Sequence, residues 1–342
     1  MSHLRNLLIL VGLGSALTAC NDVPSEPTDA NSPTVTNESA EPSLSALAAN
    51  TWMTRQPLMP WRMQMAAGTI SGTTYVVGGR ARDGAALSRV DAYRVATNTW
   101  SQVASLPSAR ANPNGATMIN GKLYVTGGSN QAGGSTRTLF VYDPETNRWT
   151  RKADMPRPSC GGDQGMIGGM LYVYTGCYAS DNAGAVLFRY NPNTDTWMMR
   201  AAPPNDHKDG AGAVVNGRFH LVSGFRLGCG ATRCDDLHSE LDVYNPATNT
   251  WMTRRPIPQK VSGASAVMLN GKLHIAAGNS FGEPSDLHQV YDPMSNTWMM
   301  QARLPSQHSH GAAAMAGGKV FYVAGIERLQ PPGPSKVYAY TP

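Results

Sequence analysis

Arginine, lysine and histidine recur at one place in this chain, shortly after a proline in each of six connecting loops. The planar guanidinium of arginine binds carboxylate, sulfate or phosphate through parallel hydrogen bonds. If the six loops converge, these side chains form a rim that binds an anion. Alternatively, they pair with loop carbonyls or with the nearby Asp163, Asp206 and Asp209. The set comprises Arg62, Arg110, Arg157, His207, Lys208, Lys260, His308 and His310.

The same loops also hold residues suited to acid–base chemistry. Asp163, Asp209 or His207 could donate or accept a proton during the opening of a sugar ring. His308 and His310 are the nearest approach to a metal motif, but two ligands do not define a selective metal site. We therefore predict no metal and no cofactor, and we assign no residue a catalytic role.

A pattern that ends in Tyr-turn-Trp separates these loops, as in "VYDPETNRW" (141–149). Five copies are complete, and a sixth is divided between "AYTP" (339–342) and "AANTW" (48–52). A repeat divided between the two chain ends predicts a closed ring. The complete copies occupy residues 92–100, 141–149, 189–197, 243–251 and 290–298.

Each repeat is predicted to form four short strands, a to d, that make one sheet. Asp-Pro or Asn-Pro begins a type I turn before strand d, and the asparagine that follows tolerates a left-handed conformation. The tyrosine and tryptophan are expected to fill the gaps between adjacent sheets. In the second repeat the expected strands are 115–120, 122–127, 138–142 and 148–153.

The period near fifty residues, the Gly-Gly doublet and the Tyr…Trp pair resemble the kelch repeat. The resemblance covers residues 51–342 and implies an all-β, six-bladed propeller, in which radial stacking buries both faces of each sheet. "TWMTR" (51–55) is then strand d of the last blade, beside its strand c in "KVYAYTP" (336–342). The complete doublet is limited to Gly78–Gly79 and Gly127–Gly128.

Alternating strand directions place the d–a and b–c loops on one face and the a–b and c–d turns on the other. The turns are nearly uniform, whereas the b–c loops vary, and residues 225–239 form the longest. Variable loops on a rigid scaffold commonly carry function. The loop face is therefore the expected binding surface.

Four cysteines fall in or beside these loops, and four cysteines allow three disulfide pairings. The strand assignment favours Cys160–Cys177, at adjacent strand ends of the third blade. It also favours Cys229–Cys234, within the longest loop. An oxidising compartment would permit both bridges.

The first fifty residues indicate export and lipidation. A basic start and an apolar segment end in "LTAC" (17–20), which resembles a lipoprotein signal (1–20) with Cys20 as the lipidated residue. An ordinary secretory signal is the alternative. By resemblance to Gram-negative sorting, Asn21 favours the outer membrane, on its periplasmic or surface side. Residues 21–50 are acidic and rich in Ser, Thr and Pro, as expected of a disordered tether.

The net charge of the whole chain is +5 at pH 7, and the expected leader and tether contribute one cation and five acids, which leaves the remaining domain near +9. Such a domain attracts anionic partners, although solubility alone would also explain the charge. No basic cluster alternates with exposed aromatic residues, which argues against nucleic acid as a partner.

Two classes of function fit these features. The favoured one is a monomeric, lipid-anchored recognition module that binds a protein or an anionic glycan through its loop face. The alternative is a carbohydrate-active enzyme similar to the six-bladed sialic acid epimerase/mutarotase, acting on an acidic sugar. A deep polar pocket with a perturbed carboxylate or histidine would favour the enzyme, whereas exposed aromatic residues would favour a protein binder.

The kelch-type galactose oxidase is a poorer match. That family has seven blades and holds copper with two histidines, two tyrosines and a cysteine crosslinked to a tyrosine. The expected disulfides leave no spare cysteine for such a crosslink. His220 and His274 occupy a strand b position that is tyrosine in other repeats, so we interpret them as packing residues.

Overall fold

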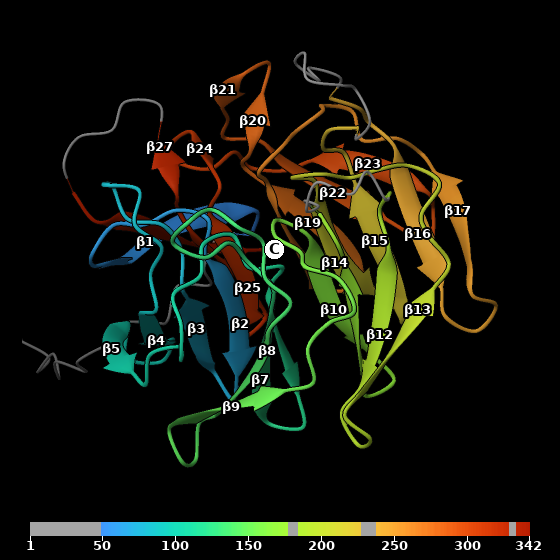
Figure 1. Ribbon diagram of the computed structural model, residues 1–342. Helices are drawn as coiled ribbons and strands as arrows, with labels where there is room; N and C mark the ends of the chain where they lie inside the picture. Colours follow the sequence, from blue (N-terminus) through green and yellow to red (C-terminus); the bar gives the residue numbers. More distant parts are fainter. Residues whose placement is uncertain (1–48, 177–183, 227–236, 328–332) are drawn as a thin grey trace, which may run out of the picture. The chain divides into compact units, whose positions relative to one another are not determined.

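Six four-stranded antiparallel sheets form the blades of a β-propeller (Figure 1). The computed structural model describes residues 49–176, 184–226, 237–327 and 333–342, which lie within one unit, Leu47–Pro342. The strands of blades 1 to 3, in the order a to d, are β2 (Ala66–Ile70), β3 (Thr73–Val77), β4 (Val90–Arg94), β5 (Thr99–Val103); β6 (Ala116–Ile119), β7 (Lys122–Thr126), β8 (Leu139–Asp143), β9 (Arg148–Lys152); and β10 (Asp163–Ile167), β11 (Met170–Tyr174), β12 (Leu187–Asn191), β13 (Thr196–Arg200).

Blades 4 to 6 continue this arrangement. Their strands, again from a to d, are β14 (Ala211–Val215), β15 (Arg218–Val222), β16 (Leu241–Asn245), β17 (Thr250–Arg254); β18 (Ser265–Leu269), β19 (Lys272–Ala276), β22 (His288–Asp292), β23 (Thr297–Met300); and β25 (Ala312–Ala316), β26 (Lys319–Val323), β28 (Ser335–Thr341), β1 (Thr51–Leu58). The four strands predicted for the second repeat agree with blade 2 to within one residue at each end.

The two ends of the chain complete blade 6. β1 pairs antiparallel with β28, with Thr51 opposite Thr341 and Trp52 opposite Tyr340. The register shifts after Arg55, and the strand continues to Leu58. The predicted closure of a six-bladed ring by residues 51–55 is therefore confirmed.

The innermost strands contact their neighbours around a closed circle, in the order β2, β6, β10, β14, β18, β25 and back to β2. Glycine allows the backbones to approach there, because it lacks a β-carbon. A β-carbon on Gly68 would lie 2.3 Å from the carbonyl oxygen of Ala116 in the adjacent blade. The circle of inner strands surrounds the cavity described below.

The outer edges of the blades are joined by a repeated hydrogen-bond unit, which we call the outer seam. In blade 2, Tyr142 Oη and the Ala104 N–H of blade 1 both donate to Asn147 Oδ1, at 2.8 and 2.9 Å. Trp149 Nε1 donates to the Ala104 carbonyl at 2.8 Å. Asn147 has a φ of +52°, the left-handed conformation expected for this position. The tryptophans that make this bond are Trp52, Trp100, Trp149, Trp197, Trp251 and Trp298.

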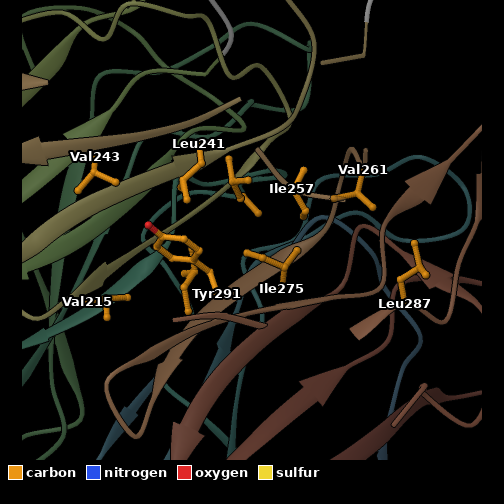
Figure 2. Packing of buried hydrophobic residues seen from close by; sticks show 11 residues of the cluster. Val215, Leu241, Val243, Ile257, Val261, Ile275, Leu287 and Tyr291 are labelled. Atoms are coloured by element: carbon orange, nitrogen blue, oxygen red, sulfur yellow. The ribbon is translucent and has the colours of Figure 1, made fainter. Parts of the chain in front are cut away.

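Apolar side chains fill the space between blades. Figure 2 shows one such cluster, in which Leu241 and Val243 of blade 4 face Ile275 and Tyr291 of blade 5. Burial is greatest along strands b and c, since both faces of these strands pack against a neighbouring blade. The blades therefore depend on one another for their hydrophobic core.

Two short two-stranded sheets decorate the b–c loops of blades 5 and 6 (Figure 1). One joins β20 (Asn279–Ser280) to β21 (Glu283–Pro284), and the other joins β24 (His308–Ser309) to β27 (Ile326–Glu327). In the part of the chain that the structure describes, no helix is long and apolar enough to span a membrane.

Candidate functional site

Six residues, one from each d–a loop, form a backbone ring at the loop-face end of the inner strands. We call this ring the collar. All six are in the left-handed region, with φ between +51° and +59°. Five printed links, each 2.7 or 2.8 Å long, run from the N–H of one collar residue to the carbonyl of the collar residue in the preceding blade. The collar comprises Gln64, Asn112, Gly161, Asp209, Gly263 and His310.

The two glycines of the collar make room for the other side chains. A β-carbon on Gly161 would lie 2.5 Å from Asn112 Nδ2 and 2.8 Å from Asp209 Oδ1. A β-carbon on Gly263 would lie 2.8 Å from the imidazole ring of His310. The amide, the carboxylate and the imidazole therefore lean across the glycine positions and gather at the opening.

A cavity of about 370 Å³ begins at the collar and continues between the inner strands. This volume is within the range of small-molecule sites. Its wall consists largely of glycine and alanine, which keep the space between the strands open. The polar collar and Asp163 lie at one end of this cavity.

Asp163 is the first residue of β10 and lines the cavity just below the collar. Burial raises the pKa of its carboxyl group to about 7, and the negative charge of Asp209 acts in the same direction. A hydrogen bond from the Gly212 N–H and the proximity of His207 lower it, but they do not offset the burial. Near neutral pH this carboxyl group is able both to donate and to accept a proton.

Asp163 departs from the pattern of the repeats. The corresponding position, opposite the last residue of strand b, is Ala66, Ala211, Ser265 or Ala312 in blades 1, 4, 5 and 6. A carboxylate where the other blades have a small side chain does not serve the packing of the repeat. Its departure from the repeat is a signal that an alignment of the six copies could have revealed.

His310 lies opposite Asp209 at the opening. Burial lowers the pKa of its imidazole, while Asp209 acts to raise it. Its Nδ1 is 3.2 Å from Ser309 Oγ. On the other side of the collar, Gln64 Oε1 accepts a hydrogen bond of 3.4 Å from Arg80 Nε. The opening thus combines a carboxylate, an imidazole and two amides.

Arg62 and Arg110, two members of the predicted rim, are buried away from the cavity. Arg62 pairs with Asp91 at 2.6 Å and donates to the carbonyls of Arg89 and Val76. Burial lowers its pKa to about 10. Arg110 donates to the carbonyl of Ala109 and to Thr138, and its guanidinium lies over the Phe140 ring. These contacts match the interpretation in which the cations pair within the protein.

The predicted histidines divide into buried and cavity-lining residues. His207 lies between the Ser223 carbonyl, 2.9 Å from Nδ1, and Asp242, 3.1 Å from Nε2. His308 is buried with Nε2 2.8 Å from Ser306 Oγ. Of the eight predicted rim residues, all within the described chain, His310 alone lines the cavity.

The remaining predicted residues lie apart from the collar opening. Lys260 is exposed, and Arg157 and Lys208 are half-buried. The structure therefore does not bring the eight residues together around one mouth, and binding of an anion by them stays a prediction. Cys160 is buried, but Cys177, Cys229 and Cys234 lie outside the described residues, so both disulfides also stay predictions.

Metal binding has no obvious site in the described ranges, because no three His, Cys, Asp or Glu side chains group there in a way that would hold an ion. His220 and His274 are buried between blades, in agreement with their interpretation as packing residues. The chemistry available at the collar is therefore that of hydrogen bonds and proton transfer.

The fold and the cavity define a six-bladed β-propeller with a polar opening on its loop face. A family model described as the KLHDC2/KLHL20/DRC7 Kelch-repeats domain matches residues 29–224, more than half of the chain, so the chain belongs to the kelch-repeat family. A solved structure titled "Structure of YjhT" is similar with a TM-score of 0.67 and 16% identity, over 83% of this chain and 95% of that chain. This likeness shows a shared fold. No curated protein matches the chain.

Proposed function

We propose that the protein binds a small, uncharged, hydroxyl-rich molecule such as a sugar at the collar. We further propose that Asp163 exchanges a proton with this ligand. The observation that carries the proposal is the Asp163 carboxyl group, with its pKa raised to about 7, at the wall of a polar cavity. A perturbed carboxyl group in a pocket is typical of a functional site.

The charge of the opening favours a neutral ligand over an anionic one. Asp209 and Asp163 contribute carboxyl groups, and the lowered pKa of His310 keeps its imidazole neutral near pH 7. The arginines that would attract an anion are paired inside the protein at Arg62 and Arg110. Carboxylate, imidazole and amide groups together supply both acceptors and donors for sugar hydroxyls.

Ring opening of a reducing sugar is the reaction that best fits one carboxyl group of this kind. The carboxylate form of Asp163 accepts the proton of the anomeric hydroxyl, and the ring oxygen takes up a proton from solvent. The bond between the anomeric carbon and the ring oxygen breaks, and an open-chain aldehyde forms. Closure on either face returns both protons, so the sum of the reaction is a change of anomer.

Binding and turnover are tested with neutral, acidic and amino sugars by titration calorimetry and by the rate of anomer exchange in NMR spectra. We expect a neutral sugar to bind, and Asp209→Asn to weaken binding by about tenfold because a charge-assisted hydrogen bond is lost. Asp163→Asn should retain binding and lose anomer exchange. Asp154→Asn, at an exposed ion pair with Arg151, is the matched control.

Each part of the proposal has its own contrary outcome. Binding that is unaffected by Asp209→Asn would place the ligand elsewhere. Anomer exchange that survives Asp163→Asn would remove the proton-transfer role of Asp163. Preference for an acidic sugar, with loss of binding in Lys260→Ala or Arg157→Ala, would restore the anion-binding rim.

A protein partner is a second candidate, favoured by one aromatic side chain. Phe281, at the tip of the β20–β21 hairpin, is 92% exposed. An exposed aromatic side chain on a loop is a common anchor in protein recognition. A photocrosslinking residue at position 281 should then capture a defined protein in the producing cell, while one at the exposed Asn270 of an a–b turn should not. Equal capture from both positions would argue against this candidate.

We also propose that the domain works on a lipid anchor at Cys20, at the outer membrane. This proposal derives from the "LTAC" pattern and from the acidic segment that follows it. Cys20→Ser should move the full chain from the membrane fraction to the soluble fraction. Persistent membrane association of that variant would exclude a lipid anchor at this residue.

A further inference from the structure

We propose that the ligand at the collar is a sugar that carries a short apolar chain, and that this chain extends through the cavity toward a methionine-lined end. This inference rests on the proposed function, because the sugar part occupies the collar. The observation behind it is the change in side-chain chemistry along one and the same cavity.

The end of the cavity opposite the collar is apolar. Thr69, Met118, Val214, Met268 and Met315 line it. All five hold the same place in their blades, because each pairs with the residue that begins the buried part of strand b. Three of these five equivalent positions are methionine, whereas the collar positions are polar or glycine.

The methionine side chains at this end are available for contact. Met118 is 42% exposed and Met315 is 39% exposed, although neither serves the packing between blades. Exposed methionine is flexible and polarizable, and it adapts to apolar ligands of different shape. These side chains can therefore close around an alkyl or acyl chain.

The middle of the cavity is wide enough for such a chain because its wall is made of small residues. Ala116, Ala213, Ala264, Ala266 and Ala313 lie between the collar and the apolar end. Alanine offers an apolar surface with no hydrogen-bonding side chain. A free sugar would satisfy the collar alone and leave this apolar surface unused, whereas a chain of several carbons would cover it.

The cavity thus has the polarity of an amphiphile. Hydroxyl groups find their partners at Asn112, Asp209 and His310, and hydrocarbon finds its partners along the alanine wall and the methionines. Each methylene group that enters the apolar part should improve affinity by about fourfold, since its transfer from water is favourable by about 0.8 kcal/mol.

The test is a series of N-acyl glucosamines and N-acyl galactosamines with acyl chains of increasing length, from acetyl to octanoyl. These probes are neutral and keep a free anomeric hydroxyl. Their dissociation constants are measured by titration calorimetry with the purified chain. We expect affinity to increase several-fold with each added pair of methylenes and then to level off when the chain reaches the end of the cavity.

Variants at the apolar end separate this contribution from the collar. Met268→Glu should flatten the dependence on chain length and leave the affinity for the acetyl compound unchanged. Met315→Ser is the second variant, in case a carboxylate at position 268 impairs folding, and it should reduce the slope. Met300→Glu, at an exposed methionine on β23, is the matched control and should keep the full slope.

The outcomes distinguish this inference from the proposed function. If the acetyl compound binds through Asp209 but longer chains add nothing, the apolar end is not a chain site and the proposed function stands. If no member of the series binds, both fail. If long chains bind equally well to Asp209→Asn, the cavity binds hydrocarbon without a sugar, and the inference as stated is overturned.

Discussion

The outer seams and the collar are two circles built from the same six repeats, and they use the repeat in opposite ways. Each seam carries the same side chains, Tyr, Trp and Asn, with the sole replacement of the asparagine by Asp195 in blade 3. The collar repeats only the backbone conformation and its hydrogen bonds, while its side chains differ. Both circles are complete where the chain ends meet, as Trp52 and Asn50 make the seam of blade 6.

This difference separates stability from function. A side chain that is required at all six seams bonds the same backbone atoms of the preceding blade each time, so its role is to hold the blades together. The collar holds its shape through backbone bonds, so its side chains are free to differ. Substitutions at the seams should therefore cost stability, and substitutions at the collar should cost binding.

Acid should break the seams first and have the largest effect. Burial lowers the pKa of His220, His274 and His308 to about 4, and that of His288 to about 3. Because these values lie below the 6.5 of the unfolded chain, the unfolded state takes up protons first as pH falls. Stability is full above pH 6.5 and decreases toward pH 4, by a total on the order of 5 kcal/mol.

Urea unfolding between pH 7.5 and pH 4 measures this loss. His220→Tyr is the sharpest variant, because Tyr75, Tyr124 and Tyr172 occupy the matching position in blades 1 to 3. It should reduce the dependence on pH. An unfolding midpoint that stays constant from pH 6.5 to pH 4 would contradict the burial of neutral histidines between blades.

Loss of one seam tryptophan should have the next largest effect. Trp149→Ala removes the packing on Tyr142 and the bond to the Ala104 carbonyl, which should cost about 3 kcal/mol of unfolding free energy. His310→Ala, at the collar, should cost less than about 1 kcal/mol, since both residues carry a β-carbon and the backbone bonds remain. Chemical denaturation compares the two. Equal losses would remove the distinction between seam and collar.

The seam asparagine allows a finer test. Asn147→Ala removes the acceptor shared by Tyr142 and the Ala104 N–H, at a cost of roughly 1–2 kcal/mol. Asn147→Asp is the control, because Asp195 accepts the same two bonds in blade 3, from Tyr190 and the Ala153 N–H. Thermal unfolding should therefore rank the wild type and Asn147→Asp together, above Asn147→Ala. A loss as large in Asn147→Asp would show that blade 3 compensates in another way.

The fold could be predicted from the sequence because the seams are uniform. The Tyr-turn-Trp pattern marked each blade, and its division between the chain ends indicated the pairing of β1 with β28. The expectation that Tyr and Trp fill gaps was correct but incomplete. Their hydrogen bonds to Asn147 and to the Ala104 carbonyl join residues of two blades and are not visible as a local pattern.

The site could be predicted only in part, and the reason lies in the side chains themselves. A cation after each proline marks the right loops, but side-chain direction decides which residue reaches the cavity. Arg62 turns into the protein toward Asp91, whereas His310 leans over Gly263 into the opening. Asp163 was recognised as a candidate acid or base, but the burial that raises its pKa depends on neighbouring blades.

Asp163→Asn should have the smallest effect on stability, and its sign is the opposite of a seam substitution. The folded pKa of about 7 lies above the ordinary value of 3.8, so the folded state disfavours the carboxylate. The wild type therefore loses stability as pH rises from about 4 through 7, and asparagine does not. Asp163→Asn should match the wild type near pH 4 and exceed it by about 1 kcal/mol at pH 8, allowing for water in the channel.

The difference between the two unfolding curves isolates this one group, because both proteins carry the same histidines. Asp154→Asn, at an exposed ion pair, should show no such gain at pH 8. A loss of stability at every pH would mean that Asp163 supports the fold through its bond to Gly212. A gain that grows with pH would mean that the chain retains a destabilising carboxyl group at the opening, which is the relation between stability and function that the seams and the collar display as a whole.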